Sequence, residues 1–216
     1  FPRFIGKKNQ HMKIKLFSIA SFLMILGSCN TPKPIELNST ELLENLRVLS
    51  SDSLEGRAFS KPGNYKAQKF IEEKFRKIGL QTVIPNGYHQ EFNYTFKGKK
   101  RQEIFPIKKP KEDLSNVLDT IVTGGNILGQ LNGQLKKSII ITAHFDHLGV
   151  KNDKIYNGAD DNASGIAALF AIAEYFKNKP TKHNLIFAAV DAEEIGSLGA
   201  EYFLQNFQDK SNIALN

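Results

Sequence analysis

The chain has 216 residues, of which 41% are apolar and 24% charged, a composition that suits one folded domain and excludes a disordered or fibrous protein. The formal net charge of +7 favours an anionic partner at first sight, but five of the 29 basic residues and no acidic residue lie within the first 30 positions. The remaining 24 basic residues nearly balance 22 acidic ones, so we expect no nucleic-acid partner.

Residues 1–28 are predicted to be an upstream extension followed by a lipoprotein signal peptide. From Met12, two lysines precede an apolar run over 16–26, which is shorter than the roughly 20 residues of a membrane-spanning helix. The run ends in Leu-Gly-Ser-Cys, which resembles the lipobox of bacterial lipoproteins. Cys29 is the chain's one cysteine, so we expect it to carry a lipid that anchors an exported protein at the periplasmic or outer-membrane face.

A polar, proline-bearing segment over residues 29–37 is predicted to be a tether, and residues 38–216 are predicted to form the folded domain. Asn38, with Glu41 three residues later, predicts a helix that begins near residue 39. A turn-rich loop follows, and apolar residues at helical spacing predict a second helix that ends before Gly79.

Alternating aromatic residues after Tyr88 predict two short strands around the lysine-rich turn 97–101. This turn could bind a polyanion, but we interpret it as a solvated hairpin tip because no aromatic reading surface accompanies it. From residue 116 onward, apolar runs alternate with helical patterns. The predicted strands are 126–131, 138–145 and 184–190, and the predicted helices are 164–178 and 197–207.

This alternation predicts an α/β fold with three layers: a mostly parallel sheet covered by helices on both faces, incomplete at the carboxyl terminus. Binding sites in such sheets lie outside the carboxyl ends of the strands. His144 and Asp146 follow one predicted strand and share a direction, while His147 is expected to point elsewhere. A histidine beside a carboxylate suits a metal ligand with its orienting partner, but a structural histidine would look the same.

Two further acidic clusters lie at predicted element ends. Asp160 and Asp161 precede the long helix, where capping explains them only in part. Asp191, Glu193 and Glu194 follow a buried strand, where a solvated loop is the alternative explanation.

Together these clusters offer one nitrogen and several oxygen donors, which suits zinc. We predict that His144, Asp161 and Glu194 are metal ligands. Glu193 is left beside the metal and is predicted to be the general base.

Three segments, AHFDHLG (143–149), GADDNASG (158–165) and DAEEIGSLGAEYF (191–203), resemble the zinc aminopeptidases of the M28 family in order and spacing. LSSDSLEGRAF (49–59) resembles the amino-terminal region of that family. The resemblance implies two zinc ions, bridged by Asp161 and bound individually by His144 and Glu194. It also implies that Glu193 deprotonates the bridging water, that Asp146 orients His144, and that the peptide after Asp161 is cis. No ligand role follows for Asp160, His147 or Asp191.

By this resemblance, residues 38–216 are predicted to be a partial M28-like peptidase domain. The family's two other ligands, an aspartate and a histidine, find no match after Glu194, so we expect the chain to be an amino-terminal fragment that is inactive alone. The whole protein is expected to be a zinc-dependent exopeptidase that removes amino-terminal residues from peptide substrates. The alternatives are a glutaminyl-cyclase-like or carboxypeptidase member of the same fold, or a lipid-anchored binding protein without catalytic activity.

Overall fold

A computed structural model describes residues 36–85, 87–97, 119–207 and 212–215. The chain separates into two units, and the fold below is that of the unit Leu37–Asn216. The predictions for the signal peptide, for Cys29, for most of the tether and for most of the lysine-rich turn lie outside the described residues. Among the helices that the structure describes, none is both long and apolar enough to cross a membrane.

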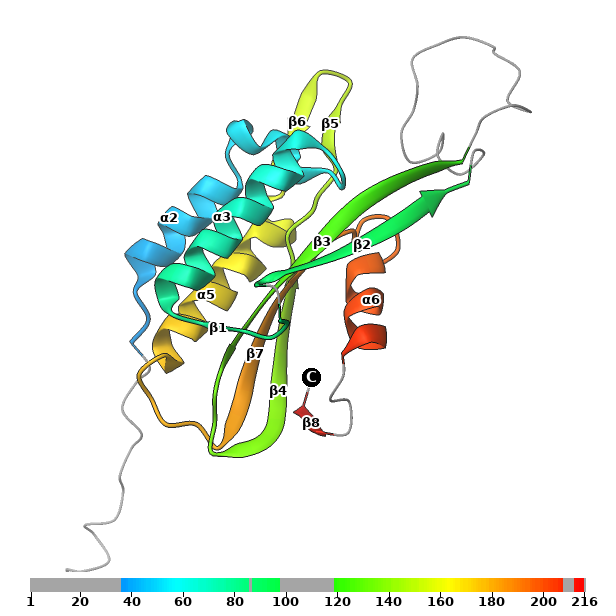
Figure 1. Cartoon of the computed structure of the whole chain (residues 1–216). Coiled ribbons are helices and arrows are strands. Elements are labelled where there is room, and N and C mark those ends of the chain that lie inside the picture. The colour runs from blue at the N-terminus through cyan, green and yellow to red at the C-terminus, as the bar shows by residue number, and fades with distance from the viewer. Residues whose placement is uncertain (1–35, 86, 98–118, 208–211, 216) are drawn as a thin grey trace, which may run out of the picture. The chain divides into compact units, whose positions relative to one another are not determined.

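One mixed sheet forms the centre of this unit (Figure 1). Its strands are β1 (Gln81–Thr82), β2 (His89–Phe96), β3 (Thr120–Leu131), β4 (Leu135–His144), β7 (His183–Val190) and β8 (Ile213–Leu215). The order is β1-β3-β7-β4-β8, and β2 also pairs with β3. β4 is parallel to β7 and β8, whereas β3 is antiparallel to β1, β2 and β7. Parallel pairing is therefore confined to the half of the sheet that carries β4.

Helices cover both faces of the sheet, which confirms the predicted α/β class (Figure 1). The helices α2 (Ser39–Leu49), α3 (Pro62–Ile78) and α5 (Ser164–Phe176) lie on one face, and α6 (Leu198–Asn206) lies on the other. The start of α2 and the end of α3 also lie where the sequence predicted them. The Asn38 Oδ1 atom accepts a hydrogen bond from the Glu41 N–H at 3.1 Å, and Gly79 ends α3 in the left-handed conformation with φ 89°.

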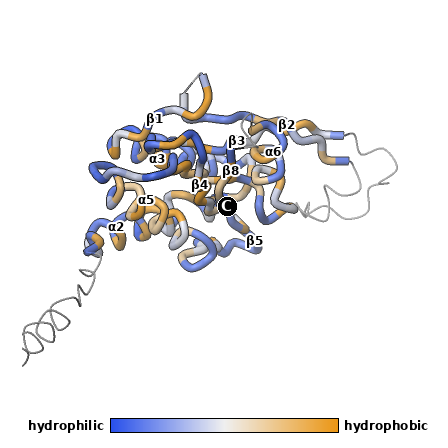
Figure 2. Tube along the Cα trace, turned by 90° about the horizontal axis from the view of Figure 1, so that it is seen from below, coloured by the Kyte–Doolittle hydropathy of each residue, from blue (hydrophilic) through white to orange (hydrophobic). Residues whose placement is uncertain are grey.

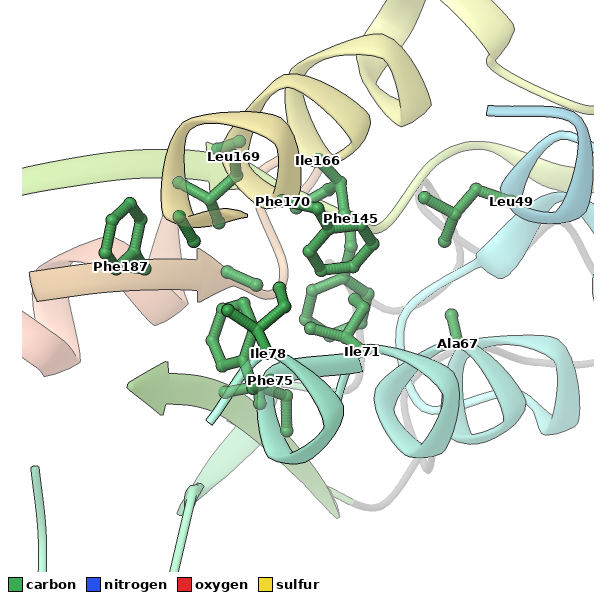
Figure 3. Close-up of a cluster of buried hydrophobic side chains, with 14 of the residues drawn as sticks. Leu49, Ala67, Ile71, Phe75, Ile78, Phe145, Ile166, Leu169, Phe170 and Phe187 are labelled. Carbon is green, nitrogen blue, oxygen red and sulfur yellow. The ribbon is translucent and has the colours of Figure 1, made fainter. Parts of the chain in front are cut away.

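The main hydrophobic core fills the space between the three helices and the sheet (Figure 3). Phe75 of α3 and Phe170 of α5 meet edge to face with their ring centroids 5.9 Å apart, and both are almost fully buried. Hydrophobic residues also dominate α5 as a whole (Figure 2). Burial of such side chains contributes about 1.5–3 kcal/mol each. This packing fixes α5 against β4 and β7. It also fixes the turn with Asp160 and Asp161 that precedes α5, called the acidic turn below.

Two features differ from the sequence-based expectations. A hairpin of two exposed strands, β5 (Gly149–Lys151) and β6 (Lys154–Tyr156), lies between β4 and the acidic turn. The sheet is mixed rather than mostly parallel because β3 runs back along β2 as its antiparallel partner. The short strand expected near residues 102–107 lies outside the described residues.

Candidate metal site

Two neighbouring parallel strands bring polar segments to one edge of the sheet. His144 ends β4 and pairs in register with Val190, which ends β7. The Phe145 N–H donates to the Val190 carbonyl at 3.0 Å, so the chain segments that follow the two strands leave the sheet together. This is the carboxyl edge, where α/β sheets form their sites.

Asp161 reaches the same edge from the turn η3 (Ala159–Ala163), which directly precedes α5. The peptide between Asp161 and Asn162 is cis, as the family resemblance implied. The Asn162 Oδ1 atom accepts a hydrogen bond from the Gly165 N–H at 2.9 Å and so helps to fix the start of α5.

Four side chains from these segments converge. The distance from His144 Nε2 to Asp161 Oδ1 is 3.0 Å, and His147 Nδ1 lies 3.9 Å from Asp161 Oδ2 and 2.6 Å from Glu194 Oε1. The Asp161 side chain is 66% exposed, whereas the side chains of both histidines and of Glu194 are at most 21% exposed. The cluster is therefore a largely buried set of donors with one face open to solvent.

The donor set fits a divalent cation such as zinc. One donor atom each from His147, Asp161 and Glu194 lies within 4.8 Å of the others. His147 Nδ1 and Glu194 Oε1 are buried, and neither makes a hydrogen bond within the described part of the chain, although the two atoms are only 2.6 Å apart. The ion-pair distance and the missing hydrogen bond are compatible, because the imidazole and the carboxylate are close but not aligned as donor and acceptor. Histidine nitrogen and carboxylate oxygen are both common zinc ligands, so these unpaired donor atoms are suited to that ion.

The position of His147 differs from the sequence-based expectation that it would point away. Side-chain alternation applies only within a strand, and β4 ends at His144. After that residue the chain is no longer part of a strand, and the His147 N–H donates to the Arg57 carbonyl at 3.3 Å. His147 is thus brought beside Asp161 and Glu194, while the ligand roles predicted for His144, Asp161 and Glu194 stay predictions.

Asp146 is fully buried and holds the acidic segment after β7. Its two carboxylate oxygens accept hydrogen bonds from the main-chain N–H groups of Glu193 and Glu194, at 2.9 and 3.2 Å. His144 Nδ1 lies 3.1 Å from the main-chain carbonyl of Asp146 and 3.6 Å from its carboxylate. Burial lowers the pKa of His144, but the hydrogen bonds and charge of Asp146 outweigh that effect and raise it to about 9. Asp146 therefore positions the main chain of Glu193 and Glu194, called the acidic pair below, as well as the imidazole of His144.

Glu193 is exposed and follows Ala192, a buried residue in the left-handed conformation with φ 60°. Its main-chain N–H is held by Asp146, and its negative charge acts on the imidazole of His144, so the carboxylate lies at the exposed rim of the site. Asp160 is also exposed and does not belong to the group of converging donors among the described residues.

Asp191 is fully buried, and its carboxylate accepts four hydrogen bonds. The donors are Asn64 Nδ2 at 2.8 Å, the Ala192 N–H at 2.8 Å, the Gly125 N–H at 3.2 Å and Gln68 Nε2 at 3.3 Å. Burial, followed by the negative charge of Asp146, raises the pKa of Asp191 to about 7. Asp191 and Asp146 together hold three successive main-chain N–H groups of the segment that carries the acidic pair.

Sequence reasoning gave no role to Arg57, Asn64 or Gln68, which link this segment to the amino-terminal part of the domain. The available signal was the LEGR stretch, whose arginine lies in a turn-rich loop and is nonetheless fully buried in the structure. Buried arginine is rare unless partners surround it.

The fold and the donor set together define an α/β protein with a candidate zinc site at the carboxyl edge of its sheet. The family model for peptidase family M28 matches residues 126–216, which confirms the resemblance inferred from the motifs. The chain is 26% identical over 210 residues to the alkaline phosphatase isozyme conversion protein of Escherichia coli (strain K12), covering 89% of this chain and 54% of that protein. It is 27% identical over 138 residues to aminopeptidase YwaD of Bacillus subtilis (strain 168), covering 62% and 29%.

Solved structures share the fold. The zinc aminopeptidase BSAP of Bacillus subtilis superposes with a TM-score of 0.57 at 16% identity, covering 82% of this chain and 67% of that one. The glutaminyl cyclase of Porphyromonas gingivalis gives a TM-score of 0.58 at 16% identity, covering 81% and 57%. The chain spans about half, or less, of the length of the two curated relatives described above.

Proposed function

We propose that the whole protein is a zinc-dependent exopeptidase that removes residues from the amino terminus of peptides. The observation that carries this proposal is the convergence of His144, His147, Asp161 and Glu194 at the carboxyl edge, with the Glu193 carboxylate next along the chain. The M28 match and the similarity to a protein named as an aminopeptidase support the same reaction.

Each group has a defined task in this proposal. His144, Asp161 and Glu194 would hold two zinc ions in the complete protein, and His147 adds a donor beside Glu194. Bound zinc supplies a polarised substrate carbonyl and a coordinated water whose pKa falls towards ~7. Glu193 would accept the proton of that water and return it to the leaving amine. The exposed carboxylates at the rim would attract the free amine of the substrate.

Replacement of Glu193 by glutamine tests the proposal. In the whole protein, E193Q keeps the size of the side chain but removes the base, so we expect turnover of an aminoacyl-anilide to fall by about 10²–10⁴-fold. Zinc content, measured by atomic absorption, should stay unchanged. The control is E73Q, which neutralises an exposed carboxylate on α3 and should have wild-type turnover. Wild-type turnover in E193Q would refute the proposed base.

A glutaminyl cyclase is the second candidate, favoured by the similarity of the fold to the Porphyromonas gingivalis enzyme. A peptide that begins with glutamine separates the two reactions by mass spectrometry. A peptidase releases free glutamine, whereas a cyclase releases ammonia and leaves the peptide chain intact. A non-catalytic binding protein of the same fold would bind zinc and yield neither product.

We further propose that the protein is a membrane-anchored lipoprotein of the exported type. The signal-peptide pattern before Cys29 supports this localisation. A C29S variant should leave the membrane fraction and lose the mass of the lipid. Equal membrane retention of C29S and the wild type would contradict the proposed anchor.

A further inference from the structure

Arg57 is a fully buried arginine whose side chain ends among main-chain carbonyls. Its Nε donates to the Phe145 carbonyl at 2.7 Å, and its Nη2 donates to the Gly158 carbonyl at 3.0 Å. Its Nη1 donates to the carbonyl of Asn157 at 2.7 Å and also to that of Leu49. No carboxylate of the described residues forms an ion pair with this guanidinium. A buried charge of this kind requires compensating hydrogen bonds, and the four carbonyls supply them.

Three of the four carbonyls belong to the segments that carry the candidate metal ligands His144, His147 and Asp161. Phe145 lies between His144 and His147, and Asn157 and Gly158 directly precede the turn η3 that contains Asp161. These segments are 88 to 101 residues away from Arg57 in the sequence.

The main chain of Arg57 extends the link to the third segment. Its carbonyl accepts hydrogen bonds from the His147 N–H and from Asn64 Nδ2, both at 3.3 Å. The same amide of Asn64 donates to Asp191 at 2.8 Å, at the start of the segment with the acidic pair. One residue thus contacts two of the three donor segments directly and the third through Asn64.

The turn that carries Arg57 has an uncommon conformation. Glu55, Gly56 and Arg57 all have positive φ, at 52°, 65° and 53°. A Cβ on Gly56 would lie 2.3 Å from the Tyr156 carbonyl oxygen, so the turn passes directly against the β5–β6 hairpin. Left-handed residues with a Cβ are unfavourable and persist only where surrounding contacts hold them. The guanidinium hydrogen bonds and the hairpin contact are such contacts.

We propose that Arg57 is a positioning residue of the candidate metal site, which fixes the segment with His144 and His147 against the turn with Asp161. A guanidinium is planar and its N–H groups point in fixed directions, so the carbonyls bonded to it keep fixed relative positions. The inference rests on the proposed metal-dependent function. It goes further by assigning a task to a residue that touches no metal donor with its side chain.

A positional role and a purely electrostatic role of Arg57 predict opposite changes in metal affinity when the residue is replaced. The cation lies close enough to interact with the charges of Asp146 and Asp161, so its removal would strengthen metal binding if charge alone mattered. If Arg57 instead holds the donor segments together, its removal weakens binding, as outer-shell substitutions do by about 10–100-fold.

The test is Co²⁺ binding, followed by visible absorption, in the full chain carrying Cys29→Ser so that no thiolate contributes. Asp161→Asn identifies the signal of the site, because that signal should disappear. We expect Arg57→Met to weaken Co²⁺ binding at least tenfold and Arg57→Lys, which keeps a charge and three donors, to weaken it less. Unchanged or tighter binding by Arg57→Met would overturn the inference.

Two controls separate positioning from general destabilisation. Arg47→Met removes an exposed arginine of α2 and should bind Co²⁺ like the wild type. Phe75→Leu loosens the core, and a loss of binding as large as that of Arg57→Met would overturn the inference. If Arg57→Met does not fold, Arg57→Lys is the deciding variant. Weaker Co²⁺ binding than that of the wild type supports the inference, and unchanged binding overturns it. A wild-type chain that binds no Co²⁺ refutes both the metal-dependent function and the inference. If the wild type binds Co²⁺ and the Arg57 variants bind it equally tightly, only the inference is refuted.

Discussion

Asp191 is the buried carboxylate whose ionisation should affect stability most directly. Its pKa is about 7 in the folded protein, against an ordinary value of 3.8, because burial and the charge of Asp146 disfavour the ionised form. The folded state therefore binds one more proton than the unfolded state between these two values. By linkage, the contribution of Asp191 to stability falls as pH rises from about 4 to about 7 and is constant above that range.

The variant D191N removes this titration. We expect the free energy of unfolding of the wild type, relative to that of D191N, to decrease between pH 5 and pH 8 by about 2–4 kcal/mol, since one pKa unit corresponds to about 1.4 kcal/mol. Urea denaturation in the presence of a chelator measures the difference without bound cations. The surface variant E73Q controls for the loss of a carboxylate. Parallel pH profiles for the wild type and D191N would contradict the prediction.

Residue-level reasoning placed His144, Asp161 and Glu194 at one edge of the sheet, where the structure also places them, and it gave no site role to His147 or Arg57. His144 and Glu194 follow the ends of two adjacent strands, and Asp161 precedes a helix, so the sequence placed all three at one edge. His147 was misplaced because the period of two ends with β4. Arg57 was missed because its partners are carbonyls, which leave no trace in side-chain sequence patterns.

The contact between η1 (Asp52–Arg57) and α3 determines how closely the Arg57 turn packs on the domain. Gly63 lies in the first turn of α3, and a Cβ there would lie 1.9 Å from the Leu54 carbonyl oxygen. A main-chain atom cannot move aside as a flexible side chain can. The absence of a side chain at Gly63 is therefore a packing requirement.

We predict that G63A lowers the free energy of unfolding by about 2 kcal/mol or more, since overpacking against main chain exceeds the helix-propensity gain of about 1 kcal/mol. At Gly79, at the other end of the same helix, an added Cβ would meet no atom within 4 Å, but φ is 89°. G79A should therefore cost only the left-handed strain, about 1–2 kcal/mol. Urea denaturation of both variants tests the contrast, and wild-type stability of G63A would contradict the packing argument.

At the level of elements, helices were more predictable than pairings. The ends of α2 and α3 follow from Asn38 and Gly79, which act locally. The antiparallel course of β3 depends on its partners β1, β2 and β7, which lie elsewhere in the chain. The β5–β6 hairpin was missed because its three-residue strands are mostly exposed and show no alternating buried face.

The candidate site also sets a condition on the whole molecule, because its donors come from three separate segments around residues 144–147, 161 and 194. None of these segments can form the site alone, and the sheet must pair β4 with β7 before the donors meet. A cation that binds only the completed arrangement lowers the energy of the native state but not that of an earlier folding transition state. Stopped-flow measurements should therefore show that zinc slows unfolding and leaves the refolding rate nearly unchanged. The metal then stabilises a fold that is already complete and does not nucleate its formation.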